Sequence, residues 1–347
     1  MDKGWKIIHV LDSETCNIIS NSIYRDIVYT TFGLSGELDN YLRCPNSLKL
    51  FTDSKLREKY LKNPNCVWRH NFSQRPLVSK NCGMVNIYHN KEVKDYITFN
   101  PNILNHIISE YNEKAIYAKG PERVSMKVEG STDMNRHMDT NFKNHENRIQ
   151  AFVTLSIDIS TNRDLSSIGS IEVLSNFNNY FDFYKYFIEE NFHYNSETYK
   201  SDKNPVILDK IFIESIPYFN NWIKEKIYKE NKYPEIKKPI NFQEMIWEFP
   251  SLKIGDLFVW DSKIPHRNTK NKSCIPRIVS YISLYPISTW KKLGNPNIYD
   301  MFAGKSKSLN GENNMDNEEE KKYYKNDWMD RVKLDINNDF VKSLLNL

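Results

Sequence analysis

Short apolar runs separated by turn residues dominate the chain after residue 120 and predict a mainly β protein. The runs are rich in Val, Ile and aromatic residues and are bounded by Gly, Asn, Ser or Pro, as strands joined by turns are. They span residues 124–128, 149–159, 168–174, 244–249, 257–260 and 278–284. Several short strands of this kind indicate a sandwich or jelly roll with α-helical additions.

One run alternates along its length between two kinds of residue. Gln150, Phe152, Thr154 and Ser156 alternate with Ala151, Val153, Leu155 and Ile157, so one face of the strand is mixed and the other is apolar. The mixed face either lines a cavity or contacts solvent, and the pattern favours neither.

Helical spacing occurs before and between these runs. Asn100-Pro101 begins one helix, whose apolar positions are Ile103, Leu104, Ile107, Ile108 and Tyr111. Residues 176–241 interrupt the strands, with helical character at 181–192 and 208–229, where Pro217 should kink or split the second helix. An insertion of this size is usually a lid or a partner surface.

The pattern divides the chain into three parts. Residues 1–119 are expected to form a helical or irregular N-terminal region that packs on the core, and residues 120–303 a β domain with the insertion 176–241. Residues 304–347 should form a polar linker and a C-terminal helix that docks on the body. The apolar positions of that helix are Val332, Leu334, Ile336, Phe340, Val341 and Leu344.

Composition indicates a soluble cytoplasmic protein without a membrane segment. The chain has 347 residues, with 48 Lys and Arg against 44 Asp and Glu and a net charge of +4, so it has no global field that recruits nucleic acid. Five cysteines without a Cys-x-x-Cys pair indicate a reducing compartment. The N-terminus lacks the apolar core of a signal peptide, and no eighteen apolar residues are consecutive.

Three side chains suggest metal chemistry. His137 and Asp139 are two residues apart, so on an extended segment both point to one face. With His266 they make two imidazoles and one carboxylate, a set that holds Fe(II) on one face and leaves the other open. A His-x-Asp pair alone is weak, because such tripeptides often lie by chance in surface loops.

Arg277 adds a second element to this pattern. His266 follows the run that ends at Trp260, and Arg277 opens the next run. A turn of about ten residues would bring the start of that second strand beside the first and near the metal, at about 3.3 Å per strand residue. A guanidinium suits the distal carboxylate of 2-oxoglutarate, because it donates two parallel hydrogen bonds and stays charged.

At these residues the chain resembles the phytanoyl-CoA dioxygenase-like family. The resemblance is carried by Gly-Asp-Leu-Phe-Val-Trp-Asp-Ser, Pro-His-Arg-Asn and Pro-Arg-Ile-Val-Ser-Tyr-Ile-Ser-Leu-Tyr-Pro within residues 255–286, by Ser-Met-Lys-Val-Glu-Gly and His-Met-Asp within 125–139, and by Ser-Ile-Gly-Ser-Ile-Glu-Val-Leu at 167–174. It covers roughly residues 120–175 and 242–287. The family usually continues with a Pro-Gly-Ser-His turn, whereas this chain has Ser-Asn-Phe-Asn at 175–178 and then the insertion, so the family's substrates do not transfer.

The resemblance implies a double-stranded β-helix, of jelly-roll or cupin-like type, and a set of site residues. His137, Asp139 and His266 match the iron ligands, and Arg277 matches the anchor of the 2-oxoglutarate carboxylate. Asn268 and Ser125 match polar positions near that cosubstrate. The implied cofactors are Fe(II), 2-oxoglutarate and O2, with ascorbate as a candidate reductant.

We therefore expect an Fe(II)- and 2-oxoglutarate-dependent dioxygenase that hydroxylates a small molecule with release of succinate and CO2. One alternative is a nucleic-acid oxygenase such as a demethylase, because lysines and aromatics are interleaved at residues 224–238, although Glu225, Glu230 and Glu235 favour a solvated face. Another is a non-catalytic jelly-roll binding protein. Lys127 either faces the pocket or is exposed, and the oligomeric state is open.

Overall fold

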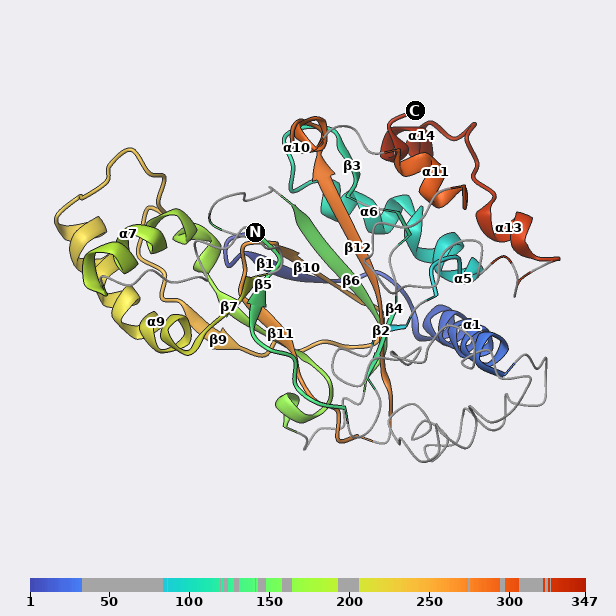
Figure 1. Ribbon diagram of the computed structural model, residues 1–347, viewed down its shortest axis with the longest axis horizontal. Coiled ribbons are helices and arrows are strands. Elements are labelled where there is room, and N and C mark those ends of the chain that lie inside the picture. Colours follow the sequence, from blue (N-terminus) through green and yellow to red (C-terminus); the bar gives the residue numbers. More distant parts are fainter. Residues whose placement is uncertain are drawn as a thin grey trace.

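Two antiparallel β-sheets form the centre of the molecule (Figure 1). The computed structural model describes residues 1–32, 84–85, 87–118, 120–121, 124–127, 131–140, 142, 148–157, 164–192, 206–273, 275–293, 297–305, 321, 324 and 326–347. Within these ranges the strand order of the large sheet is β1-β10-β6-β12-β4-β2, with β3 also paired to β12, and that of the small sheet is β8-β5-β11-β7-β9.

The large sheet consists of β1 (Trp5–His9), β2 (Met84–Val85), β3 (Ala115–Tyr117), β4 (Val124–Lys127), β6 (Ile149–Ser156), β10 (Asp256–Asp261) and β12 (Arg277–Pro286). The small sheet consists of β5 (His137–Met138), β7 (Ile171–Ser175), β8 (Val206–Ile207), β9 (Ile246–Glu248) and β11 (His266–Asn268). The predicted fold class, a mainly β protein with two antiparallel sheets of jelly-roll type and helical additions, is confirmed. The six predicted runs overlap β4, β6, β7, β9, β10 and β12.

The alternation along β6 separates two cores. Ala151, Val153 and Leu155 belong to the core on the outer face of the large sheet, whereas Phe152 packs with Phe258 in the core that also contains small-sheet residues. Phe152 and Thr154 are fully buried. The mixed face of this strand therefore lies in the interior, and the solvent-exposed interpretation is wrong.

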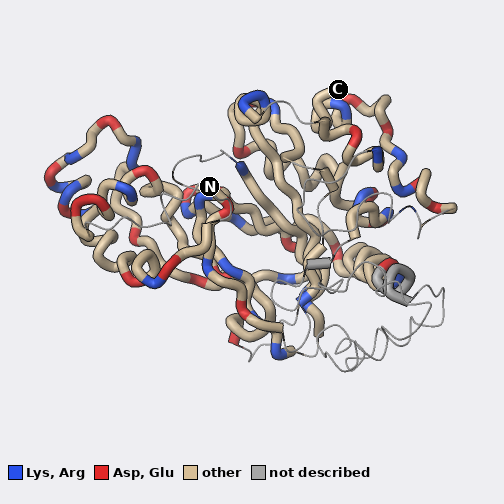
Figure 2. The backbone as a smooth tube through the Cα atoms, viewed as in Figure 1, with Lys and Arg blue, Asp and Glu red and all other residues tan. Residues whose placement is uncertain are grey.

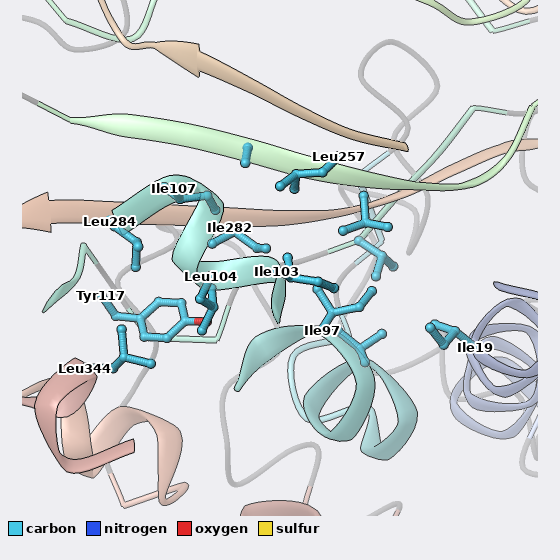
Figure 3. Packing of buried hydrophobic residues seen from close by; sticks show 14 of the residues in the cluster. Ile19, Ile97, Ile103, Leu104, Ile107, Tyr117, Leu257, Ile282, Leu284 and Leu344 are labelled. Carbon is cyan, nitrogen blue, oxygen red and sulfur yellow. The ribbon is translucent and has the colours of Figure 1, made fainter. Parts of the chain in front are cut away.

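Helices cover the outer face of the large sheet (Figure 3). The predicted helix after Asn100 is confirmed as α6 (Pro101–Ile108), and the Asn100 side chain accepts the backbone N–H of Asn102 as its cap. Figure 3 shows Ile103, Leu104 and Ile107 of this helix beside Leu257, Ile282 and Leu284 of the sheet. The same core receives side chains from α1 (Ser13–Phe32), η2 (Lys94–Thr98), α11 (Ile298–Phe302) and α14 (Asp339–Leu345).

The insertion forms a helical layer on the side of the small sheet. It contains η4 (Phe177–Asn179), α7 (Phe181–Asn191), α9 (Lys210–Trp222) and the π-helical η5 (Ile223–Lys229), while residues 193–205 lie outside the described ranges. The helix α9 runs through Pro217 without a break, so the helix is not split there, and the alternative, a kink, stays a prediction. Aromatic side chains of α7 and α9, such as Tyr184 and Phe212, pack against each other with tilted rings and belong to the core that contains small-sheet residues.

Two parts of the fold differ from the expectations. The N-terminal segment supplies β1, which pairs with β10 at the edge of the large sheet. The C-terminal segment forms two helices rather than one, α13 (Trp328–Val332) and α14, because Asn338 caps a new start by accepting the N–H groups of Phe340 and Val341. Val341 and Leu344 do dock on the body. The proposed linker falls largely on residues 306–320, outside the described ranges, and the domain boundaries stay predictions.

The connection from β10 to β12 crosses between the sheets. We expected a turn that places the second strand beside the first, but β6 lies between them, and β11 pairs instead with β5 and β7 of the small sheet. The chain therefore leaves the large sheet after Asp261, adds His266 to the small sheet, and returns at Arg277. This crossing is what places His266 and Arg277 on opposite walls of one interior.

Charged side chains of both signs are interspersed along the described chain, including α7 and α9 (Figure 2). In the insertion, the lysines Lys226, Lys229 and Lys232 form ion pairs with Glu230, Glu225 and Glu190 respectively. Among the helices of the described part, none is long and apolar enough to cross a bilayer.

Candidate metal centre

His137, Asp139 and His266 converge on the small sheet. His137 opens β5, His266 opens β11, and the two residues are direct partners in the antiparallel register. Asp139 follows the last residue of β5. One ligand atom from each residue lies within 4.8 Å of the others, and Asp139 Oδ2 is 3.4 Å from His266 Nε2. Among the described residues, this is the cluster with the composition and geometry to hold a metal ion.

Backbone carbonyls fix the orientation of both imidazoles. Nδ1 of His137 lies 2.9 Å from the carbonyl oxygen of Asn135, and Nδ1 of His266 lies 2.9 Å from that of Ile264. A carbonyl can only accept, so each Nδ1 carries the hydrogen and each Nε2 presents its lone pair to the cluster. Two lone pairs and a carboxylate repel one another unless a cation, either a proton or a metal ion, lies between them.

The electrostatics keep these groups ready to bind a metal ion. Burial lowers the pKa of His137, and the neighbouring His266 lowers it further against the opposing effect of Asp139. Burial would raise the pKa of Asp139, but when the imidazoles are protonated the hydrogen bond and charge of His266, followed by the charges of His137 and Arg148, hold it well below its usual range. Metal ligands must be deprotonated, and a low carboxylate pKa meets that requirement at neutral pH.

An ion-pair network on the opposite face of the small sheet holds the strands that carry the histidines. Glu172 of β7 accepts hydrogen bonds from both Arg136 Nε and Nη2, each at 3.1 Å, and from Arg267 Nε at 2.6 Å. Arg136 precedes His137 and Arg267 follows His266. Because neighbouring strand residues point to opposite faces, the network fixes the register from behind while both imidazoles face the interior.

Replacing Glu172 with Gln should therefore lower the free energy of unfolding by about 1–3 kcal/mol, since hydrogen bonds to charged groups are lost at a nearly buried position. Urea denaturation followed by circular dichroism measures the change. Glu225→Gln is the matched control, because both members of the Glu225–Lys229 pair are more than half exposed and such pairs add little. Equal midpoints for E172Q and the wild type would contradict a role for the network.

Arg277 lies on the opposite wall, at the first position of β12. Its side chain is fully buried, and none of its three guanidinium nitrogens has a hydrogen-bond acceptor within the described part of the chain. The guanidinium lies 4.7 Å from the centroid of the Phe152 ring. Burial lowers the pKa of Arg277 and the neighbouring Tyr281 opposes that shift. A buried guanidinium without an acceptor is costly, so this position is suited to an anionic ligand.

The other two predicted site residues lie in the same interior. Asn268 is nearly buried, its Nδ2 is 3.3 Å from the Tyr281 hydroxyl, and its Oδ1 has no hydrogen-bond partner in the described ranges. Ser125 is fully buried on β4, opposite Val279 of β12. Lys127, two residues further along β4, is also fully buried, which rules out the exposed interpretation.

Aromatic side chains connect the two walls. The Trp260 ring lies 5.5 Å from that of His266 and 5.7 Å from Phe152, which contacts Arg277 in turn. Trp260 is only 2% exposed, as expected of a packing residue. Sequence reasoning did not single out Tyr281, although its place four residues after Arg277 in an alternating strand puts it on the same face.

The remaining described histidines do not join this cluster. His9 is exposed and its Nδ1 lies 3.0 Å from Asp256 Oδ1 on the edge strand, and His89 packs against Trp328. His145 lies outside the described ranges.

Comparisons with known proteins give structural neighbours and no sequence relatives. No family model matches the chain, so the resemblance to the phytanoyl-CoA dioxygenase-like family stays a prediction. No curated protein matches it either. Among solved structures, the chain is similar to the epimerase SnoN in complex with Fe3+, alpha ketoglutarate and nogalamycin RO, with 11% identity, TM-score 0.43, and coverage of 82% of this chain and 80% of that one.

Two further structures show likenesses of the same order. EctD from S. alaskensis with 2-oxoglutarate and 5-hydroxyectoine has 10% identity and a TM-score of 0.43, covering 83% of this chain and 74% of that one. GIG2 (DUF1479) from Candida albicans has 12% identity and a TM-score of 0.47, covering 87% and 64%. Inferences about the function of this chain therefore rest on its own geometry, which combines a cluster of three candidate metal ligands with a buried guanidinium.

Proposed function

We propose that the protein is an Fe(II)- and 2-oxoglutarate-dependent dioxygenase that oxidises a small molecule. The observation that carries the proposal is the placement of His137, Asp139 and His266 on one wall and of the Arg277 guanidinium, which has no hydrogen-bond acceptor among the described residues, on the other. A metal-only binding protein would need the three ligands but would not need the buried arginine.

The donor set fits iron. Two neutral imidazoles and one carboxylate satisfy three positions of Fe(II) and leave the remaining positions for exchangeable ligands. In this role His137 and His266 would bind through Nε2, which their Nδ1 hydrogen bonds leave free. Asp139 would neutralise one of the two metal charges.

The opposite wall fits 2-oxoglutarate. Arg277 would pair with the distal carboxylate through its planar fork, and its burial would strengthen that pairing in a low-dielectric interior. Asn268 and Ser125 would contribute polar contacts to the same cosubstrate. The keto-acid end would then extend toward the metal.

Bound iron and O2 would supply the oxidative decarboxylation of 2-oxoglutarate to succinate and CO2, with transfer of one oxygen atom to the substrate. The residues of the chain bind, orient and shield these groups. Phe152, Phe258, Trp260 and Val279 form the apolar surroundings between the walls and would exclude water from the reacting atoms.

A groove beside the insertion favours a small molecule as the substrate. Phe142, three residues after Asp139, stacks on Phe181 at 4.5 Å, and the Lys263 ammonium, three residues before His266, lies 5.6 Å from the same ring. A groove of about 470 Å³ is lined by Phe142, Phe181, Tyr186 and Ile236 and by the charged residues Asp182, Lys185, Glu235 and Lys237. Small-molecule sites are about 300–1,000 Å³. The glutamate partners of Lys226, Lys229 and Lys232 reduce the charge offered to a nucleic-acid phosphate.

Release of labelled CO2 from 1-¹⁴C-2-oxoglutarate tests the proposal. Protein loaded with Fe(II) in air should release CO2 and form succinate in equal amounts, slowly without a substrate and faster when a candidate compound is oxidised. Addition of EDTA should stop both. Release no faster than with heat-denatured protein, across a panel of small molecules and a single-stranded oligonucleotide, would favour the non-catalytic binding protein.

A further inference from the structure

Lys127 makes an unusual set of contacts for a lysine inside a sheet. Its side chain is fully buried at the end of β4. Its ammonium donates to the backbone carbonyl oxygens of Thr132 at 2.7 Å, Asn268 at 3.2 Å and Thr269 at 2.7 Å. An ammonium has three hydrogens, so these three carbonyls can use all of them.

The three carbonyls belong to the segments that lead into and out of the candidate metal centre. Thr132 lies five residues before His137, and Asn268 and Thr269 follow His266 by two and three residues. The two segments also touch directly, since the backbone N–H of Met134 donates to the Asn268 carbonyl at 2.9 Å. Lys127 thus joins the segment before one histidine to the segment after the other.

Lys127 also adjoins the anion site. It is the direct partner of Arg277 in the antiparallel register of β4 and β12, and such partners are neighbours on one face. The backbone at Gly169, with a φ of +74°, packs against both residues, because a Cβ there would lie 3.2 Å from Arg277 Cβ and 3.4 Å from Lys127 Cβ. Asn271 also lies beside Gly169, and its Nδ2 donates to the backbone carbonyl of Lys127 at 2.8 Å.

We propose that Lys127 is a positioning residue for the cosubstrate pocket, which holds the segment 268–271 against β4 so that Asn268 and Arg277 face one anion. The proposal rests on the proposed function, because it takes the anion to be 2-oxoglutarate. The histidines are held separately, by the carbonyls of Asn135 and Ile264. Loss of the Lys127 contacts should therefore affect the cosubstrate more than the metal.

The chemistry of the side chain explains why lysine occupies this position. Its compact ammonium can satisfy three carbonyls that converge on one point, whereas the planar fork of an arginine directs its hydrogens outward in one plane. Burial of a charge costs several kcal/mol unless it is hydrogen-bonded, and the three carbonyls offset that cost. A neutral side chain of similar length would leave the three oxygens without this donor.

Lys127→Met and Lys127→Arg test the proposal. Under anaerobic conditions, titration of Fe(II)-loaded protein with 2-oxoglutarate, followed by the visible charge-transfer absorption of a chelated keto acid, gives the Kd for 2-oxoglutarate. K127M should raise this Kd by about tenfold or more, the lower end of what loss of a supporting partner costs at a metal site. The Kd for Fe(II) should change less than about threefold, because other groups hold the histidines. K127R should remain impaired, because it restores the charge without the converging contacts.

The exposed Lys272, in the same loop, gives the matched control, and K272M should bind 2-oxoglutarate like the wild type. A wild-type Kd for K127M or for K127R would overturn the proposal, the second by showing that charge alone suffices. If K127M weakened Fe(II) and 2-oxoglutarate binding equally and lowered the melting temperature, Lys127 would have a general structural role, and the proposal would also be overturned. If K127M does not fold, K127R carries the test. Absence of the absorption in wild-type protein would instead count against the proposed function.

Discussion

Replacing Asp139 with Ala should weaken Fe(II) binding by more than about 100-fold. Loss of a residue that only hydrogen-bonds to a metal ligand weakens metal binding by up to about 100-fold, and this change removes a direct ligand. It also removes the negative charge that faces His137 and His266. Competition with a chromophoric chelator under anaerobic conditions measures the change, and iron-dependent CO2 release should fall to background. His137→Ala should have the same effect, since each ligand contributes one of three bonds.

The control for this prediction is His9→Ala. His9 lies at the sheet edge, its side chain is 64% exposed, and it pairs with Asp256 away from the cluster. H9A should bind Fe(II) like the wild type. If D139A bound iron, or H137A turned over, at the wild-type level, the three residues would not be the metal ligands that the proposed function requires.

Replacing Arg277 with Met should raise the Kd for 2-oxoglutarate by at least about 30-fold, the equivalent of about 2 kcal/mol for a buried, hydrogen-bonded charge pair. Binding of Fe(II) should not change, because Arg277 lies on the opposite wall from the triad. The same variant should be at least as stable as the wild type without ligands, because it removes a buried guanidinium that has no acceptor in the described ranges. Methionine can still pack on Phe152.

Two measurements separate this account from a structural role of Arg277. Anaerobic titration gives the Kd for 2-oxoglutarate, and urea denaturation of the metal-free protein gives the stability. Arg25→Met, an exposed arginine on α1, should leave both unchanged. A large loss of stability in R277M would show that the guanidinium is part of the fold rather than a site for an anion.

Local patterns allowed much of the fold to be predicted. The helix α6 has a capping Asn100 and a Pro101 in its first turn, signals that act within a few residues. The strands β6, β10 and β12 have alternating or apolar runs that mark buried sheet faces. The two-residue spacing of His137 and Asp139 predicted that they share a face, and the structure brings both to one cluster with His266.

Features that depend on distant contacts were missed. The crossing of the chain to the small sheet at His266 depends on pairing with His137 and Val173, 129 and 93 residues away, which no local pattern encodes. Lys127 could not be distinguished from an exposed strand lysine, because its three acceptors are backbone carbonyls. Backbone groups carry no signature in the sequence. The break between α13 and α14 was missed because Asn338 was not recognised as a cap.

The most direct test of the central claim is an anaerobic titration of the purified protein with Fe(II) and 2-oxoglutarate, with wild type and His266→Ala compared side by side. A chelated keto acid on Fe(II) gives a weak visible charge-transfer band. We predict that the band develops in the wild type with one equivalent of each ligand and does not develop in H266A. A folded, iron-loaded wild-type protein without the band would contradict the account.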